Sequence, residues 1–431
     1  MRLSRYPAFV VASMIVVAAC TSSTSSSPTP TSAATSAATS AATAKPAVTI
    51  SYWHGYNPVE TKAFNDIVLP LFKKLHPEIT VESQSIPYDD LRKKLLTGVA
   101  GGQLPDVLRA DLAWVPEFAD LGALVALDDA MGADFTTLKS KVFPGALSTN
   151  LWKGKYYGIP LDTNTRVLLW NKEMYAKAGL TAPAKTWDEF KANAGKVADG
   201  KTTWAYGEGG TGGWNILPWI WSGGGNVTDA GITKATGYLN GPDSVAALQF
   251  LVDLKKASQL GPSILGGDPK TDVGYAKDSY ANVLDGPWMV PIFKDQYPNK
   301  TVQLAAMPAG KGGSISVVGG EDIVIFKTSK QQPAAAEFVK FMLSREAELE
   351  MGKVGQMPVL NELVGSADLP AYYSVFMEQL KTAKARTPHP KWPKIDDAIG
   401  TAVTLALKGD KTPQAALDDA AKVVDDLLAG R

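Results

Sequence analysis

Aromatic side chains that could hold a ligand are frequent in this chain of 431 residues, which contains eleven tryptophans and fourteen tyrosines. A flat aromatic ring can stack on the apolar C–H face of a pyranose, whose hydroxyl rim then needs polar partners. The alternative for each tryptophan is core packing. Six tryptophans stand beside glycine or proline in loop-like surroundings: Trp53, Trp214, Trp219, Trp221, Trp288 and Trp392. We favour a ligand-stacking role for Trp221, in the run WIWSGGGN whose glycines let a ligand approach the backbone, and for Trp288 in DGPWM.

Polar side chains that could bind the rim of such a ligand are found in several short motifs. Carboxylates accept hydroxyl hydrogen bonds, and bonds to charged groups are the stronger kind. A surface or hinge salt bridge is the alternative role for each of these residues. The candidates are Asp111, Asp162, Asn164, Gly320 and Glu321 in the motif GGED, and Arg386, which with Trp392 flanks the loop TPHPKWP.

Motifs for other chemistry are weak. Residues 207–212 fit G-x-G-x-x-G, but Pro218 in the following WNILPWIW predicts a poor dinucleotide helix, so we expect only a glycine-rich loop. The three histidines lie far apart without an H-E-x-x-H motif, and no G-x-S-x-G occurs. We therefore expect no cofactor, no metal and no catalytic residues. Lys+Arg and Asp+Glu balance at 43 each, which gives no electrostatic reason to expect nucleic acid as a partner.

The stretch 154–180 is expected to place these side chains at a cleft. An extended run meets Pro160, which lacks a ladder donor and must leave its sheet or lie at an edge. Val167 to Trp170 then predicts a second strand, and Asn171 is expected to cap a short helix that ends at Gly179. A short polar segment between two sheets is typical of a hinge between two lobes.

The region before this hinge alternates strands and helices. Val48, Ile50 and Tyr52 predict a strand, and a helix with a kink at Pro70 follows. This alternation predicts an α/β sheet, whose ligands gather at the carboxyl ends of the strands. His54, Tyr56 and Asp111 are the residues at those ends.

The region after the hinge is expected to be mostly helical towards its end. Residues 186–189, Thr-Trp-Asp-Glu, predict a capping box. Pro242, Pro333 and Pro413 stand where the first turns of helices are expected.

The N-terminus predicts export and anchoring. Arg2 and Arg5 precede an apolar run too short for a usual membrane span, so residues 1–19 are expected to be a signal peptide. The end of this run resembles a lipoprotein lipobox, with Cys20, the only cysteine, as the lipidated residue. Residues 20–46 are expected to be this anchor cysteine and a disordered Ser/Thr/Ala/Pro tether.

Several motifs in a fixed order make the chain resemble the sugar-binding proteins of bacterial ABC importers, the maltose-binding-like family. The resemblance begins with G-K-x-Y-G-I-P-x-D-T-N-T and W-N-K-E-M-Y in the hinge stretch. It continues over residues 104–129, 285–289, 307–322, 355–359 and 385–395. Trp288 resembles the family's sugar-stacking aromatic residue, and Asn164 matches a hinge position that carries a sugar-binding acid in maltose-binding proteins.

This resemblance implies a two-lobed periplasmic-binding-protein-like α/β fold with a three-segment hinge. We expect one lobe from residues 47–161 and 319–365, and the other from residues 162–318 and 366–431. The protein would be a monomer, lipid-anchored at the outer face of the cell membrane, that binds a di- or oligosaccharide by hinge closure and delivers it to the permease subunits of an ABC transporter. A secreted hydrolase that uses a carboxylate pair in a Trp-lined cleft is the alternative, and a structural surface protein is a third class.

Overall fold

The computed structural model describes residues 46–430. The predicted signal peptide, Cys20 and the tether up to residue 45 lie outside the described residues. From Lys45 onward the chain forms one compact unit.

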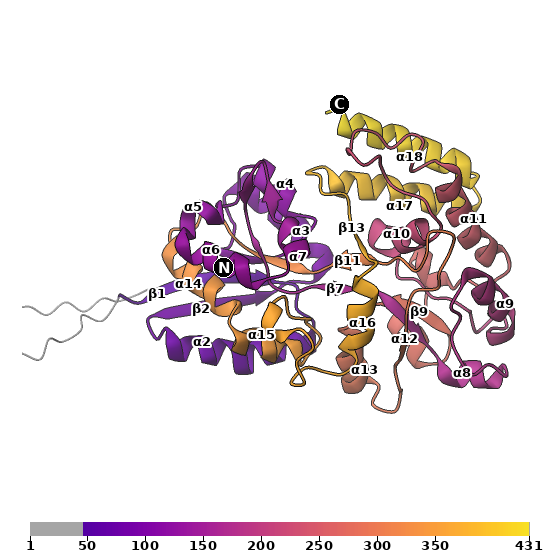
Figure 1. Cartoon of the computed structure of the whole chain (residues 1–431), viewed down its shortest axis with the longest axis horizontal. Coiled ribbons are helices and arrows are strands. Elements are labelled where there is room, and N and C mark those ends of the chain that lie inside the picture. Colours follow the sequence, from indigo (N-terminus) through magenta and orange to yellow (C-terminus); the bar gives the residue numbers. More distant parts are fainter. Residues whose placement is uncertain (1–45, 431) are drawn as a thin grey trace, which may run out of the picture. The chain divides into compact units, whose positions relative to one another are not determined.

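A five-stranded sheet forms the first half of the fold (Figure 1). Its order is β2-β1-β3-β12-β6, with β1 parallel to β2 and β3, and β12 antiparallel to β3 and β6. The strands span Val48–His54 (β1), Ile79–Ser85 (β2), Val107–Asp111 (β3), Ile159–Pro160 (β6) and Glu321–Ile325 (β12). The alternation of Ile50 and Tyr52 correctly predicted β1, in which both side chains are buried. Because β12 comes from much later in the chain, this sheet is built from two separate segments.

The fold also contains two three-stranded sheets. The antiparallel sheet β10-β8-β9 contains Gln303–Ala305, Val167–Trp170 and Asn282–Asp285. The small sheet β13-β11-β7 contains Lys384–Ala385, Val317–Gly319 and Asn164–Thr165, and Figure 1 shows these strands side by side. The chain thus leaves the five-stranded sheet after β6, pairs as β7 in the small sheet and continues as β8. It returns through β11 to β12.

Helices pack around the two larger sheets, and a short hairpin joins β4 (Leu151–Trp152) to β5 (Lys155–Tyr156). Helices α1–α7, α14 and α15, with the π-helical turn η1, span Pro58–Ala63, Phe64–Val68 (η1), Leu69–Leu75, Tyr88–Gly101, Val115–Asp120, Leu127–Met131, Ala133–Lys141, Pro144–Ser148, Gln332–Met342 and Arg345–Gly352. Helices α8–α13 and α16–α18, with η2 and η3, span Lys172–Lys177, Trp187–Val197, Gly213–Ser222, Pro242–Lys256, Pro262–Leu265 (η2), Thr271–Ala276, Met289–Gln296, Asn361–Leu363 (η3), Tyr373–Leu380, Trp392–Lys408 and Pro413–Leu428.

The predicted helix starts are confirmed. The side chain of Asn171 accepts a hydrogen bond from the Met174 amide, and that of Thr186 accepts one from the Glu189 amide. The second half of the predicted capping box is absent, because the Glu189 carboxylate binds the Lys185 amide instead. The three predicted prolines all lie in the first turns of their helices, which are α11, α14 and α18. Near Pro70 the helix forms a π-helical turn, Phe64–Val68, before α2, which accommodates the proline's missing N–H.

Residues 207–212 contain no helix, as predicted, and the run around Pro218 that follows them forms helix α10. The helix continues through the proline, whose missing N–H leaves the carbonyl four residues earlier, that of Trp214, without its helical donor. The guanidinium of Arg166 donates to this carbonyl over 3.2 Å and to the Asn215 carbonyl over 3.3 Å. A tertiary donor therefore replaces the bond that proline removes.

Buried apolar side chains gather on both sides of the small sheet. Two clusters contain buried residues of β1, β3 and β12 and of the helices beside them. None of their buried residues comes later in the sequence than Leu363. The other two clusters are built mainly from residues 167–317 and from the helices after residue 372. Within residues 46–430, no helix combines the length and the apolar character that crossing a membrane requires.

Asp322 lies on β12 inside the five-stranded sheet, and only 1% of its surface is exposed. Asn150 donates to it over 2.7 Å, but burial, with Asp111 and Asp162 nearby, raises its pKa to about 8. The folded protein therefore keeps a proton that the unfolded chain loses near its ordinary pKa of 3.8. Its contribution to the free energy of unfolding is present at low pH and is lost as pH rises towards about 8.

We expect Asp322→Asn to remove this contribution, so that the free energy of unfolding falls less steeply with pH than in the unchanged protein. The difference in free energy of unfolding between the two proteins should change by about a few kcal/mol between the ordinary pKa of 3.8 and the raised pKa of about 8. Urea unfolding at a series of pH values measures it, with the exposed Asp410→Asn as control. If the free energy of unfolding changed with pH equally in Asp322→Asn and in the unchanged protein, the raised pKa of Asp322 would be contradicted.

Candidate functional site

A cavity of about 670 Å³ lies where the five-stranded sheet meets the small sheet and helices α10, α13 and α17. Its volume falls within the range of ligand pockets in proteins. Five aromatic side chains, polar amides and charged groups of both signs line it. The residues predicted from the sequence that line it are Asp111, Asn164, Trp288, Gly320, Glu321, Arg386 and Trp392.

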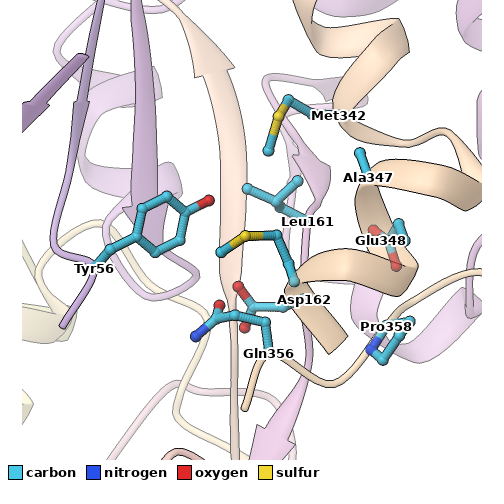
Figure 2. Close-up of a pocket in the computed structure, with 9 residues that line it drawn as sticks. Tyr56, Leu161, Asp162, Met342, Ala347, Glu348, Gln356 and Pro358 are labelled. Carbon is cyan, nitrogen blue, oxygen red and sulfur yellow. The ribbon is translucent and has the colours of Figure 1, made fainter. Parts of the chain in front are cut away.

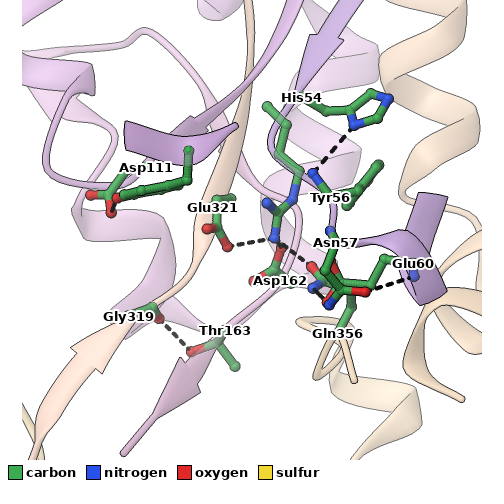
Figure 3. A network of polar contacts seen from close by, with 12 residues as sticks. His54, Tyr56, Asn57, Glu60, Asp111, Asp162, Thr163, Gly319, Glu321 and Gln356 are labelled. Carbon is green, nitrogen blue, oxygen red and sulfur yellow. Dashed lines mark hydrogen bonds and ion pairs between the residues drawn. The ribbon is translucent and has the colours of Figure 1, made fainter. Parts of the chain in front are cut away.

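Arg109 is the centre of a polar network at the floor of this cavity. Figure 3 shows its partners Asp162, Glu321 and Gln356. One nitrogen, Nη2, contacts Asp162 Oδ2 at 2.9 Å, Glu321 Oε2 at 2.6 Å and Gln356 Oε1 at 2.5 Å. Gln356 in turn donates to Glu60 Oε1 over 2.6 Å. One guanidinium thus joins the segment after β6, the start of β12 and the segment after α15.

Carboxylates outnumber cations in this network. Burial raises the pKa of Glu321 well above its ordinary value, and although Arg109 opposes the shift, Asp162 adds to it. Burial also raises the pKa of Glu60 against the opposing effect of Arg109. Both shifts favour the protonated form of these carboxyl groups, which can donate as well as accept a hydrogen bond.

Arg386 and Asp111 form a second buried ion pair on the cavity wall. Arg386 Nη2 lies 2.8 Å from Asp111 Oδ1, and the Tyr88 hydroxyl donates to the other carboxylate oxygen. Asp111 ends β3, whereas Arg386 directly follows β13 of the small sheet. Burial acts to lower the pKa of Arg386, but Asp111 and Tyr88 outweigh it and the pKa rises. The Arg386 guanidinium therefore stays charged, and its bond to Asp111 joins the two sheets.

Two aromatic pairs contribute to the cavity wall from different parts of the fold. Trp214 of α10 and Trp288 before α13 have ring centroids 6.1 Å apart and planes 31° apart. Tyr88 of α3 and Trp114 before α4 have centroids 5.3 Å apart and planes 30° apart. The guanidinium of Arg386 lies 5.7 Å from the Trp214 ring centroid. The cavity thus offers ring surfaces contributed by both halves of the fold.

Asn164 and the glycines opposite it form the part of the wall nearest to the small sheet. Asn164 pairs with Gly319 across β7 and β11, and its Oδ1 has no hydrogen-bond partner among residues 46–430. A Cβ on Gly319 would meet this oxygen at 2.1 Å, so only glycine leaves room for the amide. Gly320 has φ +139° and its Cβ would meet the Asp162 carbonyl at 2.4 Å. Both glycines are therefore needed for the close packing of the chain segments here.

A much smaller cavity, of about 10 Å³, lies behind the Arg109 network. Figure 2 shows Asp162, Gln356 and Glu348 among its lining residues. The Val359 amide donates to Glu348 Oε2 over 2.8 Å, and burial raises the pKa of Glu348 well above its ordinary value. This space is large enough for about one water molecule.

Four of the predicted ligand contacts do not line this cavity, and they are His54, Tyr56, Asp162 and Trp221. His54 is fully buried and packs on Tyr56 with ring centroids 4.5 Å apart, while the Tyr56 ring lies 4.7 Å from the Arg109 guanidinium carbon. Neither His54 nor Tyr56 lines the large cavity; they support Arg109 from behind. Burial lowers the pKa of His54 to about 3, and Arg109 adds to the effect, so the imidazole is neutral. Asp162 likewise binds Arg109 from outside the cavity lining.

Trp221 belongs to the core around α10 and does not line the cavity. Gly223 and Gly225, which follow it, allow the end of α10 to pack closely against α11. A Cβ on Gly223 would meet Ala247 of α11 at 2.9 Å, and one on Gly225 would meet Ser244 at 2.3 Å. Trp392 does line the cavity although it is largely buried in the same core.

Sequence reasoning missed several lining residues. Arg109 lies inside β3, and a charged residue within a buried strand was the signal that could have identified it. Trp214 was noted as a loop-like tryptophan but not assigned to the site. The sequence analysis assigned no binding role to the other polar and aromatic lining residues, which are Asn57, Glu60, Tyr88, Arg92, Trp114, Asn215, Gln356, Asp396 and Asp397. Within residues 46–430, no group of three or more His, Cys, Asp or Glu side chains could hold a metal ion.

We expect Arg109→Met to lower the free energy of unfolding by about 3–5 kcal/mol at neutral pH, because it leaves Asp162 and Glu321 buried without their cation. The loss should shrink in acid, where the carboxylates become neutral. Urea unfolding measures it, and the double variant Arg109→Met/Glu321→Gln should recover part of the loss. A single variant as stable as the unchanged protein would show that Arg109 does not hold the network together.

The chain is similar to known binding proteins over most of its length. It is 26% identical over 390 residues to a binding protein of Brucella abortus, covering 86% of this chain and 90% of the relative. It is 25% identical over 333 residues to the multiple sugar-binding protein of Streptococcus mutans, covering 72% of this chain and 75% of the relative. An ABC transporter solute-binding protein from Thermotoga lettingae, solved with α-D-tagatose bound, is 29% identical and superposes with a TM-score of 0.80, covering 88% of this chain and 99% of that chain.

These likenesses agree with the two-lobed α/β fold built around the small sheet. Residues 57–349, more than half of the chain, match the family of bacterial extracellular solute-binding proteins. The chain therefore belongs to the bacterial extracellular solute-binding protein family.

Proposed function

We propose that this protein binds a carbohydrate outside the membrane and delivers it to the permease of an ABC transporter. The observation that carries the proposal is the cavity of about 670 Å³, lined by two aromatic pairs and by hydrogen-bonding groups. The relatives support it: one is a multiple sugar-binding protein and another was solved with a bound sugar. The family supports an extracytoplasmic location.

The aromatic pairs support a ligand of two or more sugar rings. Trp214 and Trp288 can take the apolar face of one ring, and Tyr88 and Trp114 that of another. The Trp288 ring lies over Gly286, where a Cβ would come within 2.2 Å of the indole. The position of this ring is therefore fixed by the backbone before any ligand arrives. The carboxylate oxygens of Glu321, which lines the cavity, are suited to accept hydroxyl hydrogen bonds.

Hinge closure is the mechanism we propose. The lobes would be residues 47–161 with 319–365, and residues 162–318 with 366–431. A ligand that contacts both lobes binds the closed form better than the open form and so populates it. Glu321 and Asn164 lie at the segments where the chain passes between the larger sheets, so a ligand that binds them acts directly at the hinge. The closed form is then the one that the permease recognises.

The proposal extends to anchoring and assembly. We propose that residues 1–19 are removed as a signal peptide, that Cys20 carries the lipid anchor, and that residues 20–46 form the tether. The mature protein would act as a monomer. The relatives named above are binding proteins, and we propose that this chain also binds without cleaving. Reducing ends released from an oligosaccharide at an enzyme-like rate would favour the hydrolase alternative.

A panel of mono-, di- and oligosaccharides tests the function directly. At least one sugar should raise the melting temperature and give a saturable calorimetric isotherm. Trp288→Ala should then weaken binding by about 1–3 kcal/mol, because a large stacking surface is lost. Trp152→Ala, in the β4–β5 hairpin and outside the cavity lining, is the matched control.

No response to any sugar in the panel would contradict carbohydrate binding. Unchanged affinity in Trp288→Ala, with binding otherwise intact, would leave the function standing and reassign Trp288 to packing.

A further inference from the structure

One ion pair of the cavity wall connects the two proposed lobes. Asp111 ends β3 and belongs to residues 47–161, whereas Arg386 follows β13 and belongs to residues 366–431. Arg386 Nη2 lies 2.8 Å from Asp111 Oδ1, and both residues line the cavity. Arg386 is 8% exposed and Asp111 is 6% exposed, so both charges are largely removed from water. The pair is therefore a buried contact between segments that hinge bending would separate.

Asp111 is held in place from its own side of the cavity. The Ala113 amide donates to its Oδ1 over 2.8 Å, and the Tyr88 hydroxyl donates to its Oδ2. All three residues belong to the same proposed lobe. The carboxylate is therefore oriented towards Arg386 by contacts that the other lobe does not supply.

Arg386 has fewer partners than Asp111. Asp111 is its one ion-pair partner among residues 46–430, and its Nε has no hydrogen-bond partner there. The guanidinium also lies 5.7 Å from the Trp214 ring centroid, and this ring belongs to the same proposed lobe as Arg386. Water can solvate both charges when the lobes are apart, but in the closed cavity the guanidinium depends on Asp111.

The ion pair also connects the two aromatic pairs of the cavity wall. Tyr88, which donates to Asp111, packs on Trp114 with ring centroids 5.3 Å apart. Trp214, which lies against Arg386, belongs to the other aromatic pair. A continuous series of contacts thus runs from one aromatic pair through the ion pair to the other.

The loop that follows Arg386 faces the first lobe at a second residue. Burial lowers the pKa of His389, Lys391 adds to this shift, and Asp120 at the end of α4 opposes it. A carboxylate has such an effect only when it lies near the imidazole. The segment between β13 and α17 therefore lies beside the first lobe at more than one point.

Burial makes this ion pair selective for one arrangement of the lobes. A buried pair adds little net stability because both charges lose their hydration, but either charge alone in the closed cavity is strongly unfavourable. The lobes can therefore close fully only where Asp111 and Arg386 meet. The place where they meet also sets the distance between the two aromatic pairs.

Resting on the proposed hinge closure, we propose that Asp111 and Arg386 are positioning residues that latch the two lobes in one register. The latch forms as the lobes close. It holds the aromatic pairs at a spacing that lets each pair stack on one ring of the sugar. Carbohydrates whose rings match this spacing are therefore selected.

Distance measurements without ligand test the latch separately from sugar binding. In a Cys20→Ser background, spin labels at Lys93→Cys on α3 and Lys394→Cys on α17 report the distance between the lobes by pulsed electron paramagnetic resonance. Asp111→Asn or Arg386→Gln should shift the unliganded distribution to longer distances, because each leaves one charge unpaired in the closed form. The double variant removes both charges and should recover part of the shift.

Calorimetry with a sugar that binds the unchanged protein gives a second readout. Each single variant should weaken binding roughly tenfold, as expected when one charge-assisted contact that favours the closed form is lost. Lys139→Met is the matched control, because it removes a 2.9 Å ion pair with Asp128 that lies within one proposed lobe and outside the cavity lining. This control should leave both the distance distribution and the affinity unchanged.

A milder variant keeps the test decisive if a single variant does not fold. Tyr88→Phe removes only the hydroxyl that donates to Asp111, and it should shift the unliganded distribution in the same direction by a smaller amount.

Two results would overturn the latch. Unliganded distributions of the variants that match that of the unchanged protein would show that the ion pair does not hold the lobes. A shift in the double variant equal to the sum of the single shifts would show that the two residues act separately. If no sugar binds the unchanged protein, the proposed function fails, whereas the unliganded distances still decide whether the latch exists.

Discussion

The guanidinium of Arg109 is the contact on which the arrangement of the site depends. A single nitrogen reaches Asp162 after β6, Glu321 at the start of β12 and Gln356 after α15. These segments are far apart in sequence, and two of them adjoin strands of the small sheet. Because the charges are buried, the network contributes more to fixing geometry than to net stability. It holds the chain segments that pass near the hinge in one arrangement.

The same network connects the floor of the cavity to the hinge. Glu321 lines the cavity, binds Arg109 and begins the strand that follows β11. Behind Arg109, Tyr56 and His54 form a buried aromatic layer that keeps the guanidinium facing the acids. A ligand that binds Glu321 therefore alters the charge balance around Arg109. On the proposed function, Glu321 would link ligand binding to the geometry of the crossing segments.

Local sequence patterns were sufficient for much of the fold. Alternation predicted β1, and the caps at Asn171 and Thr186 were recognised because each depends on residues only three positions apart. Local patterns do not explain how helix α10 continues through Pro218, because the replacement donor is Arg166, about fifty residues earlier. Local rules cannot include a contact of that kind.

The site was only partly predictable for the same reason. Trp288 and Asn164 lie in motifs that resemble a known family, and both line the cavity. Placing residues at the ends of strands was not enough for His54 and Tyr56, whose side chains turn into the core. Conversely, Trp114 and Asp397 line the cavity although the sequence analysis gave neither of them a binding role. Which face of a helix borders a cavity is decided by packing across the whole fold.

Closure of the two lobes over a ligand is the central claim, and a distance across the cavity tests it most directly. Cys20 is the only cysteine, so a Cys20→Ser background accepts spin labels at Lys93→Cys on α3 and Lys394→Cys on α17. Both positions are exposed, and both helices contribute residues to the cavity wall. Pulsed electron paramagnetic resonance should show a shorter and narrower distance distribution when carbohydrate saturates the site. An unchanged distribution at saturation confirmed by calorimetry would contradict the account.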